Sequence, residues 1–345
     1  MKAPFSIIAA HGRDPIFRTR YRSDVDAIRT VRSLDAADID RCLQRVQARH
    51  PADRYVIAPS SEFLNQYMLA HRQWFTERGC DIPLVDAETY ARVTNKSTFR
   101  ELCIDAGIAV PARRDPSTGA YPFVAKPRAN INALGRSLYP ALIHTAADWD
   151  AQREALGNLD DYYFEELVEG PSYYLLYYIP AAPSARVFSW SQRNLLQQPG
   201  GKSMVLAVSD TVHTEPISGR VIAMLRSACF HGLAMVEVIR RGSEYVAIEL
   251  NPRLWGPMQL VRNSGSQLIR AFLEDAIDGA VTHADPDAGH AAGYVWLGGL
   301  RPGMTWHSER PRFPWWSLTS HIADDVYFRS DTMGLFIDEC VRRHE

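Results

Sequence analysis

The feature that most constrains the fold is an apolar β-hairpin over residues 234–251, AMVEVIRRGSEYVAIELN. A three-residue Gly-Ser-Glu loop over 242–244 would place Glu237 directly opposite Glu249 on one face of the sheet. Cross-strand neighbours of this kind lie about 5 Å apart. Two carboxylates so close on a half-buried face repel each other, so either one is protonated or a cation lies between them.

The residues that end the hairpin are polar as well. Asn251 points the same way as Glu249, because strand residues two apart share a face. Two glutamates and one amide oxygen suit Mg²⁺, which proteins usually hold with one or two carboxylates and substrate phosphates. Arg253 follows at once and could face the same phosphates. The alternative is an exposed hairpin with two solvated glutamates and an Asn-Pro turn.

Two lysines at the ends of predicted elements bear on this choice. Lys96 opens a helix, and Lys126 ends the strand YPFVAKP at residues 121–127. Each lysine alone is most often a solvated side chain. Two lysines and an arginine beside a divalent cation, however, are what a nucleoside triphosphate needs.

The first 90 residues show a strand–helix alternation that predicts a small α/β unit. Its elements are a buried strand over 5–10, a helix over 36–50, a strand followed by a loop over 54–62 and a helix over 63–79. Ligands in such sheets gather at the carboxyl ends of strands, here HGRD at 11–14 and PSSE at 59–62. Both segments could equally be simple turns.

The rest of the chain mixes helices with a run of consecutive strands. The pattern predicts helices over 94–107, 218–233 and 266–279, and strands over 162–170, 172–179, 185–194 and 203–210. The tail after residue 280 is rich in Trp, Pro and Gly, including YVWLGGLRPGMTWH at 294–307 and PRFPWW at 311–316. These aromatic residues either pack in a core or form a wall for a bulky substrate.

Composition excludes several classes of protein. The chain has 345 residues, 46% of them hydrophobic, and a net charge of −2. There is no basic surplus for nucleic acid, no polybasic block for a membrane surface, and no apolar run that approaches the roughly 18 residues of a membrane span. The five cysteines are scattered and suit free thiols in a reducing cytoplasm, which is where we expect the protein.

Over residues 94–265 the motifs together resemble the ATP-grasp superfamily of carboxylate–amine ligases. The chain is most similar to the carbamoyl-phosphate-synthase-like carboligases and the amino-acid ligases. The resemblance is carried by the segment from Lys96 to Pro111, by FVAKP ending at 126–127, by EELVEG at 165–170, and by Glu237 with IELNPRLWG.

The resemblance implies an α/β (α+β) architecture in which a Rossmann-like preATP-grasp domain precedes the two-subdomain ATP-grasp fold. The expected divisions are a preATP-grasp domain over 1–90, an ATP-grasp N-terminal subdomain over 91–163, a C-terminal subdomain over 164–280, and an extension over 281–345 that packs on the ATP-grasp domain. A homodimer is the usual assembly of the superfamily.

The resemblance also implies roles for individual residues. ATP would be bound by Lys96, Lys126, Arg128, Glu165, Glu166, Val168, Arg193 and Lys202, with the backbone of 165–168 at the adenine edge. Mg²⁺, which Mn²⁺ could replace, would be bound by Glu237, Glu249 and Asn251. Arg253 and Lys126 would be the catalytic residues. The loop after Lys126 departs from the family pattern, because it holds one glycine, Gly135, where several are usual.

The implied activity is an ATP- and Mg²⁺-dependent ligase that activates a small-molecule carboxylate as an acyl-phosphate. An amine then forms an amide or peptide bond, and ADP and phosphate are released. One alternative is a carboxylase or carbamoyl-type enzyme that phosphorylates bicarbonate or carbamate. Another is a module that binds ATP without turnover.

Overall fold

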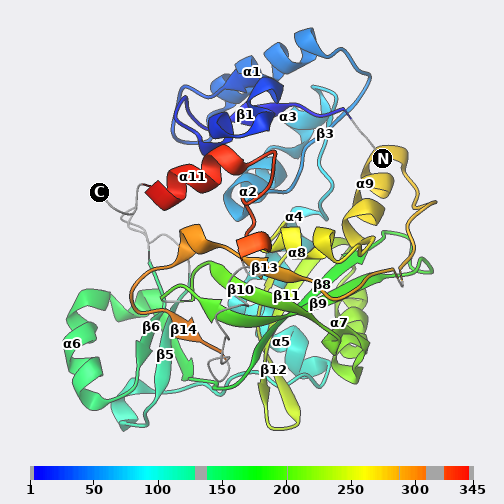
Figure 1. The fold of residues 1–345 in the computed structure, drawn as a ribbon. Coiled ribbons are helices and arrows are strands. Elements are labelled where there is room, and N and C mark those ends of the chain that lie inside the picture. The colour runs from blue at the N-terminus through cyan, green and yellow to red at the C-terminus, as the bar shows by residue number, and fades with distance from the viewer. Residues whose placement is uncertain (1–3, 129–137, 200, 287, 308–321, 342–345) are drawn as a thin grey trace.

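The computed structural model describes residues 4–128, 138–199, 201–286, 288–307 and 322–341. They form an α+β fold with an N-terminal α/β region, a large central sheet and a small sheet beside it (Figure 1). None of the helices in these ranges is both long enough and apolar enough to span a membrane.

The N-terminal region is built from short parallel strand pairs and helices. Its strands are β1 (Ile7–Ala9) with β2 (Val25–Ile28), and β3 (Tyr55–Val56) with β4 (Cys80–Asp81). Its helices are α1 (Ala36–Arg49), α2 (Glu62–Ala70), α3 (Arg72–Thr76) and α4 (Ala87–Thr94). The helix expected over 36–50 is confirmed. The helix expected over 63–79 is wrong, because His71, at φ −120° and ψ 25°, leaves the helical conformation and separates α2 from α3.

Helix α1 shows how local sequence fixes these elements. The Asp35 side chain caps its first turn by accepting a hydrogen bond from the Asp38 backbone N–H at 2.9 Å. Ile39, Leu43 and Val46 follow at helical spacing and are all buried. Each buried aliphatic side chain contributes about 1.5–3 kcal/mol, so this stripe holds α1 against the core.

The small sheet is antiparallel and carries a helix on one face. Its strand order is β6 (Ala141–Ile143), β5 (Phe123–Pro127), β7 (Tyr162–Glu166). Phe123 and Ile143 pack against Trp149 of helix α6 (Ala146–Leu156). Because side chains alternate along β5, Lys126 points to the opposite face, away from α6.

The large sheet runs through the middle of the molecule. Among the described strands its order is β12-β11-β8-β9-β10-β13, and β14 pairs with β9. The strands are β8 (Ser172–Ile179), β9 (Phe188–Gln197), β10 (Met204–Asp210), β11 (Gly232–Arg241), β12 (Glu244–Asn251), β13 (Gly293–Val295) and β14 (Thr305–Trp306).

Both faces of the large sheet are covered, which explains the unbroken apolar run SYYLLYYI in β8. One face packs on α5 (Lys96–Asp105), α7 (Pro216–Ser227) and the N-terminal region through Tyr173, Leu175 and Tyr177. The other face packs on α8 (Met258–Asn263) and α9 (Leu268–Asp278) through Tyr174, Leu176 and Tyr178.

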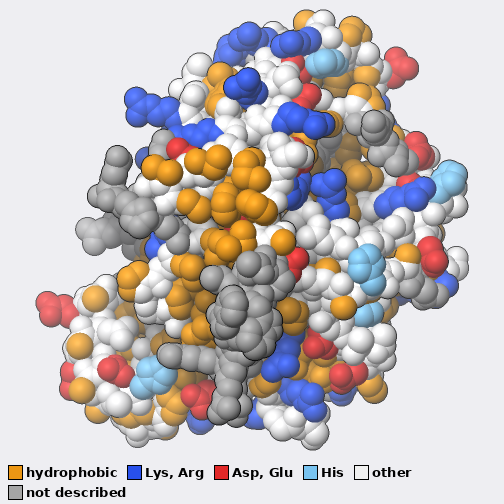
Figure 2. All heavy atoms as spheres, viewed as in Figure 1, with side chains coloured by type: hydrophobic (Ala, Val, Ile, Leu, Met, Phe, Trp, Pro, Cys, Tyr) orange, Lys and Arg blue, Asp and Glu red, His pale blue; other side chains and the backbone are white. Residues whose placement is uncertain are grey.

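The C-terminal residues return to the N-terminal region. Helix α11 (Met333–Val341) lies beside the first 3-10 turn, where Arg18 Nη1 meets Asp338 Oδ2 at 2.5 Å (Figure 1). Figure 2 shows hydrophobic side chains gathering over α11, and Ile337 and Val341 are exposed there. In the tail, Tyr294 packs in the core, which favours the packing interpretation for 294–307. The second aromatic segment, 311–316, lies outside the described residues.

Candidate active site

The hairpin brings the two predicted carboxylates together by a different route from the one expected. Glu237 pairs with Glu249, so the predicted pairing is confirmed. The three-residue loop is wrong, because Arg241 pairs with Glu244 and leaves a two-residue Gly-Ser turn. A bulge at Ile248 then adds one residue to β12 and restores the register that places the glutamates opposite each other.

Each of the two glutamates has its own hydrogen-bond donor. The Ser172 hydroxyl donates to Glu237 Oε1 at 2.9 Å, and the Asn251 amide donates to Glu249 Oε1 at 2.6 Å. Burial and the Glu249 carboxylate raise the pKa of Glu237, whereas the Ser172 hydrogen bond and Lys126 lower it. Within the described ranges neither carboxylate forms an ion pair, and Lys126 and Lys96 act on the pair only from a longer distance.

The turn that carries Arg253 is anchored to the N-terminal region. The Leu254 backbone N–H donates to the Pro59 carbonyl at 3.0 Å, and the buried Asn65 amide of α2 donates to the Pro252 carbonyl at 3.3 Å. Arg253 Nη2 contacts Asn251 Oδ1 at 3.4 Å. The segment at 59–62, which leads from β3 into α2, therefore helps to position the arginine.

The two predicted lysines meet beside the small sheet: Lys126 lies on β5, and Lys96 is the first residue of α5. Lys126 Nζ forms an ion pair with Glu165 Oε1 at 2.5 Å, and Lys96 Nζ donates to the Pro127 carbonyl at 2.9 Å. Burial and the nearby charge of Lys126 lower the pKa of Lys96, whereas the charge of Glu249 raises it. These electrostatic effects indicate that Lys96, Lys126 and Glu249 lie near one another.

Two neighbours of Lys126 also face this site, and the sequence analysis missed both. Tyr163 pairs with Lys126 across the small sheet, and the Arg113 guanidinium lies 4.2 Å from the centre of its ring. Arg128, which was predicted to bind ATP, lies 6.0 Å from the same ring and donates to the Asp160 carbonyl. The signal that could have found Tyr163 is its position two residues before Glu165, on the same face of β7. The predicted glycine-poor loop with Gly135 lies outside the described residues.

The segment predicted to meet adenine joins the two sheets. The Glu166 carboxylate accepts from the Ala112 backbone N–H at 3.1 Å and pairs with Arg241 at 2.8 Å, so this side chain is a structural clamp. Val168 is buried. Gly170, at φ +148°, is required because a Cβ there would lie 2.1 Å from the Arg240 carbonyl oxygen. Contact with adenine stays a prediction.

Arg193 and Lys202, which were also predicted to bind ATP, lie away from the two carboxylates. Arg193 pairs with Tyr173, whose side chain packs on the helix-covered face opposite to Glu237. Because side chains alternate along β9, Arg193 lies on the face opposite to Glu237, and its contact with the phosphates stays a prediction. Lys202 lies in the β9–β10 turn, 4.6 Å from the Tyr139 ring, which follows the loop after Lys126.

Tyr174 is a further site residue that the sequence analysis missed. It pairs with Glu237 across the large sheet. Burial raises the pKa of this phenol, as do Glu237 and Glu249, while Arg253 opposes them. The phenol therefore stays neutral between the acids and the arginine. Sequence pattern hides it, because Tyr174 stands within a continuous run of buried residues.

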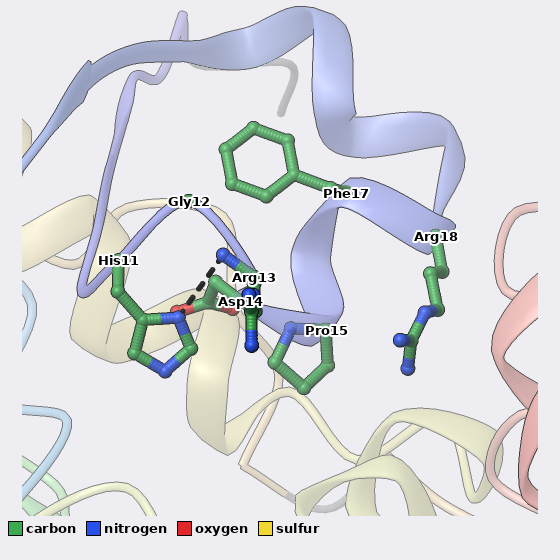
Figure 3. A pocket seen from close by; sticks show the side chains of 7 residues that line it. All are labelled: His11, Gly12, Arg13, Asp14, Pro15, Phe17 and Arg18. Carbon is green, nitrogen blue, oxygen red and sulfur yellow. Dashed lines mark hydrogen bonds between the residues drawn. The ribbon is translucent and has the colours of Figure 1, made fainter.

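The other predicted strand end, HGRD, lines an open pocket of its own. This pocket has a volume of about 770 Å³ and carries the cationic or titratable side chains of His11, Arg13 and Arg18 (Figure 3). His11 Nδ1 accepts a hydrogen bond from the Arg13 backbone N–H at 3.2 Å. None of its lining residues belongs to the predicted ATP or metal site.

The donor set at the hairpin suits a hard divalent cation. The described residues contain no group of three His, Cys, Asp or Glu side chains placed to bind a metal. Two carboxylates and one amide are instead the partial set typical of Mg²⁺, which takes its remaining oxygens from water and phosphates. Two facing carboxylates that form no ion pair among the described residues are suited to a cation.

The fold is shared with solved structures, whereas sequence comparison finds no relative. No protein-family model matches the chain, and no curated protein matches its sequence. The biotin carboxylase domain of Hydrogenobacter thermophilus 2-oxoglutarate carboxylase, a dimer in complex with MgADP, ADP and bicarbonate, matches with a TM-score of 0.60 at 13% identity over 84% of this chain and 68% of that one. Biotin carboxylase from Campylobacter jejuni, in complex with β-γ-ATP, gives 0.59 at 16% identity over 79% and 65%. An ADP complex of N5-carboxyaminoimidazole ribonucleotide synthetase gives 0.61 at 16% identity over 84% and 74%.

This chain has an ATP-grasp fold. It spans about two thirds to three quarters of the length of these neighbours. At such low identity the match establishes the architecture and leaves the chemistry to the side chains. The ATP-grasp fold predicted from the motifs is thus confirmed, while the domain boundaries and the homodimer stay predictions.

Proposed function

We propose that this chain is an ATP- and Mg²⁺-dependent ligase that joins a small-molecule carboxylate to an amine. The observation that supports this most directly is the facing pair of Glu237 and Glu249, which form no ion pair among the described residues and have Lys96 and Lys126 near them. Opposite charges held apart in this way suit a metal–triphosphate complex, in which anionic phosphates meet the lysines and the cation meets the glutamates.

Under this proposal the chain's own residues act mainly by positioning and electrostatics. Lys96 and Lys126 offset charge on the phosphates, while Glu237, Glu249 and Asn251 hold Mg²⁺. The cation, when bound, supplies Lewis-acid stabilisation of the phosphoryl oxygens. The substrate carboxylate attacks the γ-phosphate, the bond to the β-phosphate oxygen breaks, and ADP leaves with that electron pair.

Arg253 acts in the second half-reaction of this proposal. Its planar guanidinium can hold two oxygens at once, first on the acyl-phosphate and then on the tetrahedral intermediate. The amine attacks the acyl carbon, loses a proton, and phosphate departs as the amide forms. The Leu254–Pro59 and Asn65–Pro252 hydrogen bonds anchor the turn that carries Arg253, which supports this oriented role.

A second candidate is an enzyme that phosphorylates bicarbonate instead of an organic acid. The observation in its favour is that the structural neighbours include a biotin carboxylase domain solved with bicarbonate and ADP. The same lysines, acids and arginine would serve it, because carboxyphosphate and acyl-phosphate carry the same charged group. What differs is the acid that accepts the phosphoryl group.

ADP release measured across acids and amines separates these candidates. The ligase predicts ADP only when a particular carboxylate and amine are both present, with an amide of the expected mass. ADP release with bicarbonate alone would favour the second candidate. ATP binding without ADP release under any combination would contradict both and would favour a non-catalytic module. The Glu249→Gln variant serves as the blank.

A further inference from the structure

A chain of buried polar side chains leads through the large sheet to Glu237. Gln192 Nε2 donates to Asn194 Oδ1 at 2.8 Å, and Asn194 Nδ2 donates to Ser172 Oγ at 2.8 Å. The Ser172 hydroxyl then donates to Glu237 Oε1 at 2.9 Å. Gln192, Asn194 and Ser172 are each 0% exposed. These groups lie on three neighbouring strands, β9, β8 and β11, in one otherwise apolar layer.

Burying three polar side chains is costly unless their hydrogen bonds are made. Apolar residues would fill the same positions of a sheet at lower cost. On the same strand, Ser191 shows what a structural hydroxyl does, because it donates to the Asp210 carbonyl at 2.7 Å and contacts His213 on the opposite face. The Gln192–Asn194–Ser172 chain differs, since it ends on a charged group of the site.

The direction of every hydrogen bond in this chain is set by the carboxylate at its end. An ionised Glu237 can only accept, so Ser172 must use its single O–H to donate to it. Ser172 Oγ then accepts from the Asn194 amide, and Asn194 Oδ1 accepts from Gln192. Gln192 Oε1, at the far end, has no hydrogen-bond partner within the described ranges. These hydrogen bonds therefore fix a single orientation of Glu237.

The partner glutamate is oriented differently. Glu249 is held by Asn251, which lies on its own strand and itself contacts Arg253. Glu237 has no such neighbour on β11, because Ile239 and Met235 share its face. The hydrogen-bonded side chains of β8 and β9 supply the donor to Glu237 instead. The two carboxylates are thus fixed by independent donors, so that they can share one cation.

We propose that Ser172, oriented by Asn194 and Gln192, is a positioning residue for the divalent cation. Its hydroxyl holds the Glu237 carboxylate in the rotamer that faces Glu249. This inference rests on the proposed function, since it assigns a supporting contact to the metal site of that function. Supporting contacts of this kind typically change metal affinity by about 10–100-fold.

The test is a titration with Mn²⁺ at saturating ADP, in which electron paramagnetic resonance measures the concentration of free Mn²⁺. Ser172→Ala is expected to weaken Mn²⁺ binding about 10–100-fold, and Asn194→Ala to weaken it less. Ser172→Thr keeps the hydroxyl and should restore most of the affinity. Binding of ADP in EDTA should stay unchanged in all three variants, because that binding depends on the lysines.

The matched control is Ser191→Ala, which removes a hydroxyl of equal burial from the opposite face and should leave Mn²⁺ binding unchanged. Wild-type Mn²⁺ affinity in Ser172→Ala, or an equal loss in Ser191→Ala, would overturn the inference. So would a parallel loss of metal-free ADP binding, which a merely structural role predicts. If Ser172→Ala does not fold, Asn194→Ala and Ser172→Thr decide the matter. Failure of the wild-type protein to bind Mn²⁺ would instead overturn the proposed function.

Discussion

The two sheets that form the site differ in how their charged side chains are paired. On the small sheet, Lys126 is neutralised by Glu165 at 2.5 Å, and both side chains are largely buried. On the large sheet, Glu237 and Glu249 face each other and receive hydrogen bonds from neutral donors only. On the small sheet the lysine is thus already paired with an acid, whereas the hairpin of the large sheet places two acids together.

This difference indicates where ligands contribute stability. A cation that enters between Glu237 and Glu249 removes a repulsion that the fold itself maintains. A phosphate that approaches Lys126, by contrast, must share that lysine with Glu165. We therefore expect metal binding to depend steeply on the hairpin acids, and phosphate binding to depend more moderately on the lysine.

The largest effect should come from the large sheet. Glu249→Gln removes a direct ligand, so turnover should fall to background and Mn²⁺ affinity should drop more than about 100-fold, beyond the usual loss for a supporting contact. Steady-state ADP release and Mn²⁺ titration measure both. An unaffected rate at saturating Mg²⁺ would show that the pair is not a metal site.

The next effect concerns the arginine at the end of the hairpin. Arg253→Lys keeps the charge but loses the planar fork, so ATP affinity should change little while turnover falls about 10²–10³-fold, the typical cost of one oriented oxyanion donor. The ratio of ADP to amide released should also rise, because a poorly held acyl-phosphate meets water. Full turnover with full coupling would make Arg253 a structural clamp only.

A smaller effect is expected on the small sheet. Lys126→Ala should weaken ADP binding about 10–100-fold, as the loss of one charged hydrogen bond predicts. Part of that loss would come from leaving Glu165 without its partner. The double variant Lys126→Ala with Glu165→Gln separates the two contributions in the same calorimetric titration. Should the double variant bind ADP as the wild type does, the lysine itself would not contact phosphate.

The smallest effect is on stability without metal. The pKa of Glu237 is raised by burial and by Glu249, so the folded state retains a proton that the unfolded chain loses above a pKa of about 4.5. This contribution to stability is present at low pH and is lost as pH rises. Glu249→Gln removes part of the cause and should stabilise the metal-free protein at pH 8 by about 1 kcal/mol or less, and less at pH 5.

Urea unfolding in EDTA at the two pH values measures this difference. Addition of Mg²⁺ should reverse its sign at pH 8, because the wild-type pair gains a ligand that the variant cannot hold. A variant that is less stable than the wild type at pH 8 in EDTA would show that the two carboxylates do not repel each other in the folded state.

The sequence predicted those parts of the site that follow from short-range rules. Alternation along a strand places Lys126, Glu249 and Asn251, and the cross-strand pairing places Glu237. The loop length was wrong, yet the register was right, because the bulge at Ile248 compensated for the shorter turn. Bulges carry no clear sequence signature. The loop length alone therefore could not have predicted this register.

The parts that sequence could not predict depend on contacts between distant segments. Ser172 lies in a uniformly buried strand and Asn194 in a strand of mixed burial, and only the neighbouring strand shows that they serve Glu237. Arg193 was assigned to the phosphates from its position on the meander, without a register to fix its face. Short strands such as β2 and β4, with four and two residues, are below the length at which periodicity is informative.

The central claim is that Glu237 and Glu249 share a divalent cation with ATP phosphates, and a crystal structure with Mn²⁺ and a non-hydrolysable ATP analogue tests it most directly. The account predicts one or more anomalous Mn²⁺ peaks bonded to oxygens of both glutamates and of the phosphates, with Lys126 on the phosphate side. An ordered nucleotide whose Mn²⁺ lies away from both carboxylates, or a nucleotide bound elsewhere in the molecule, would contradict it.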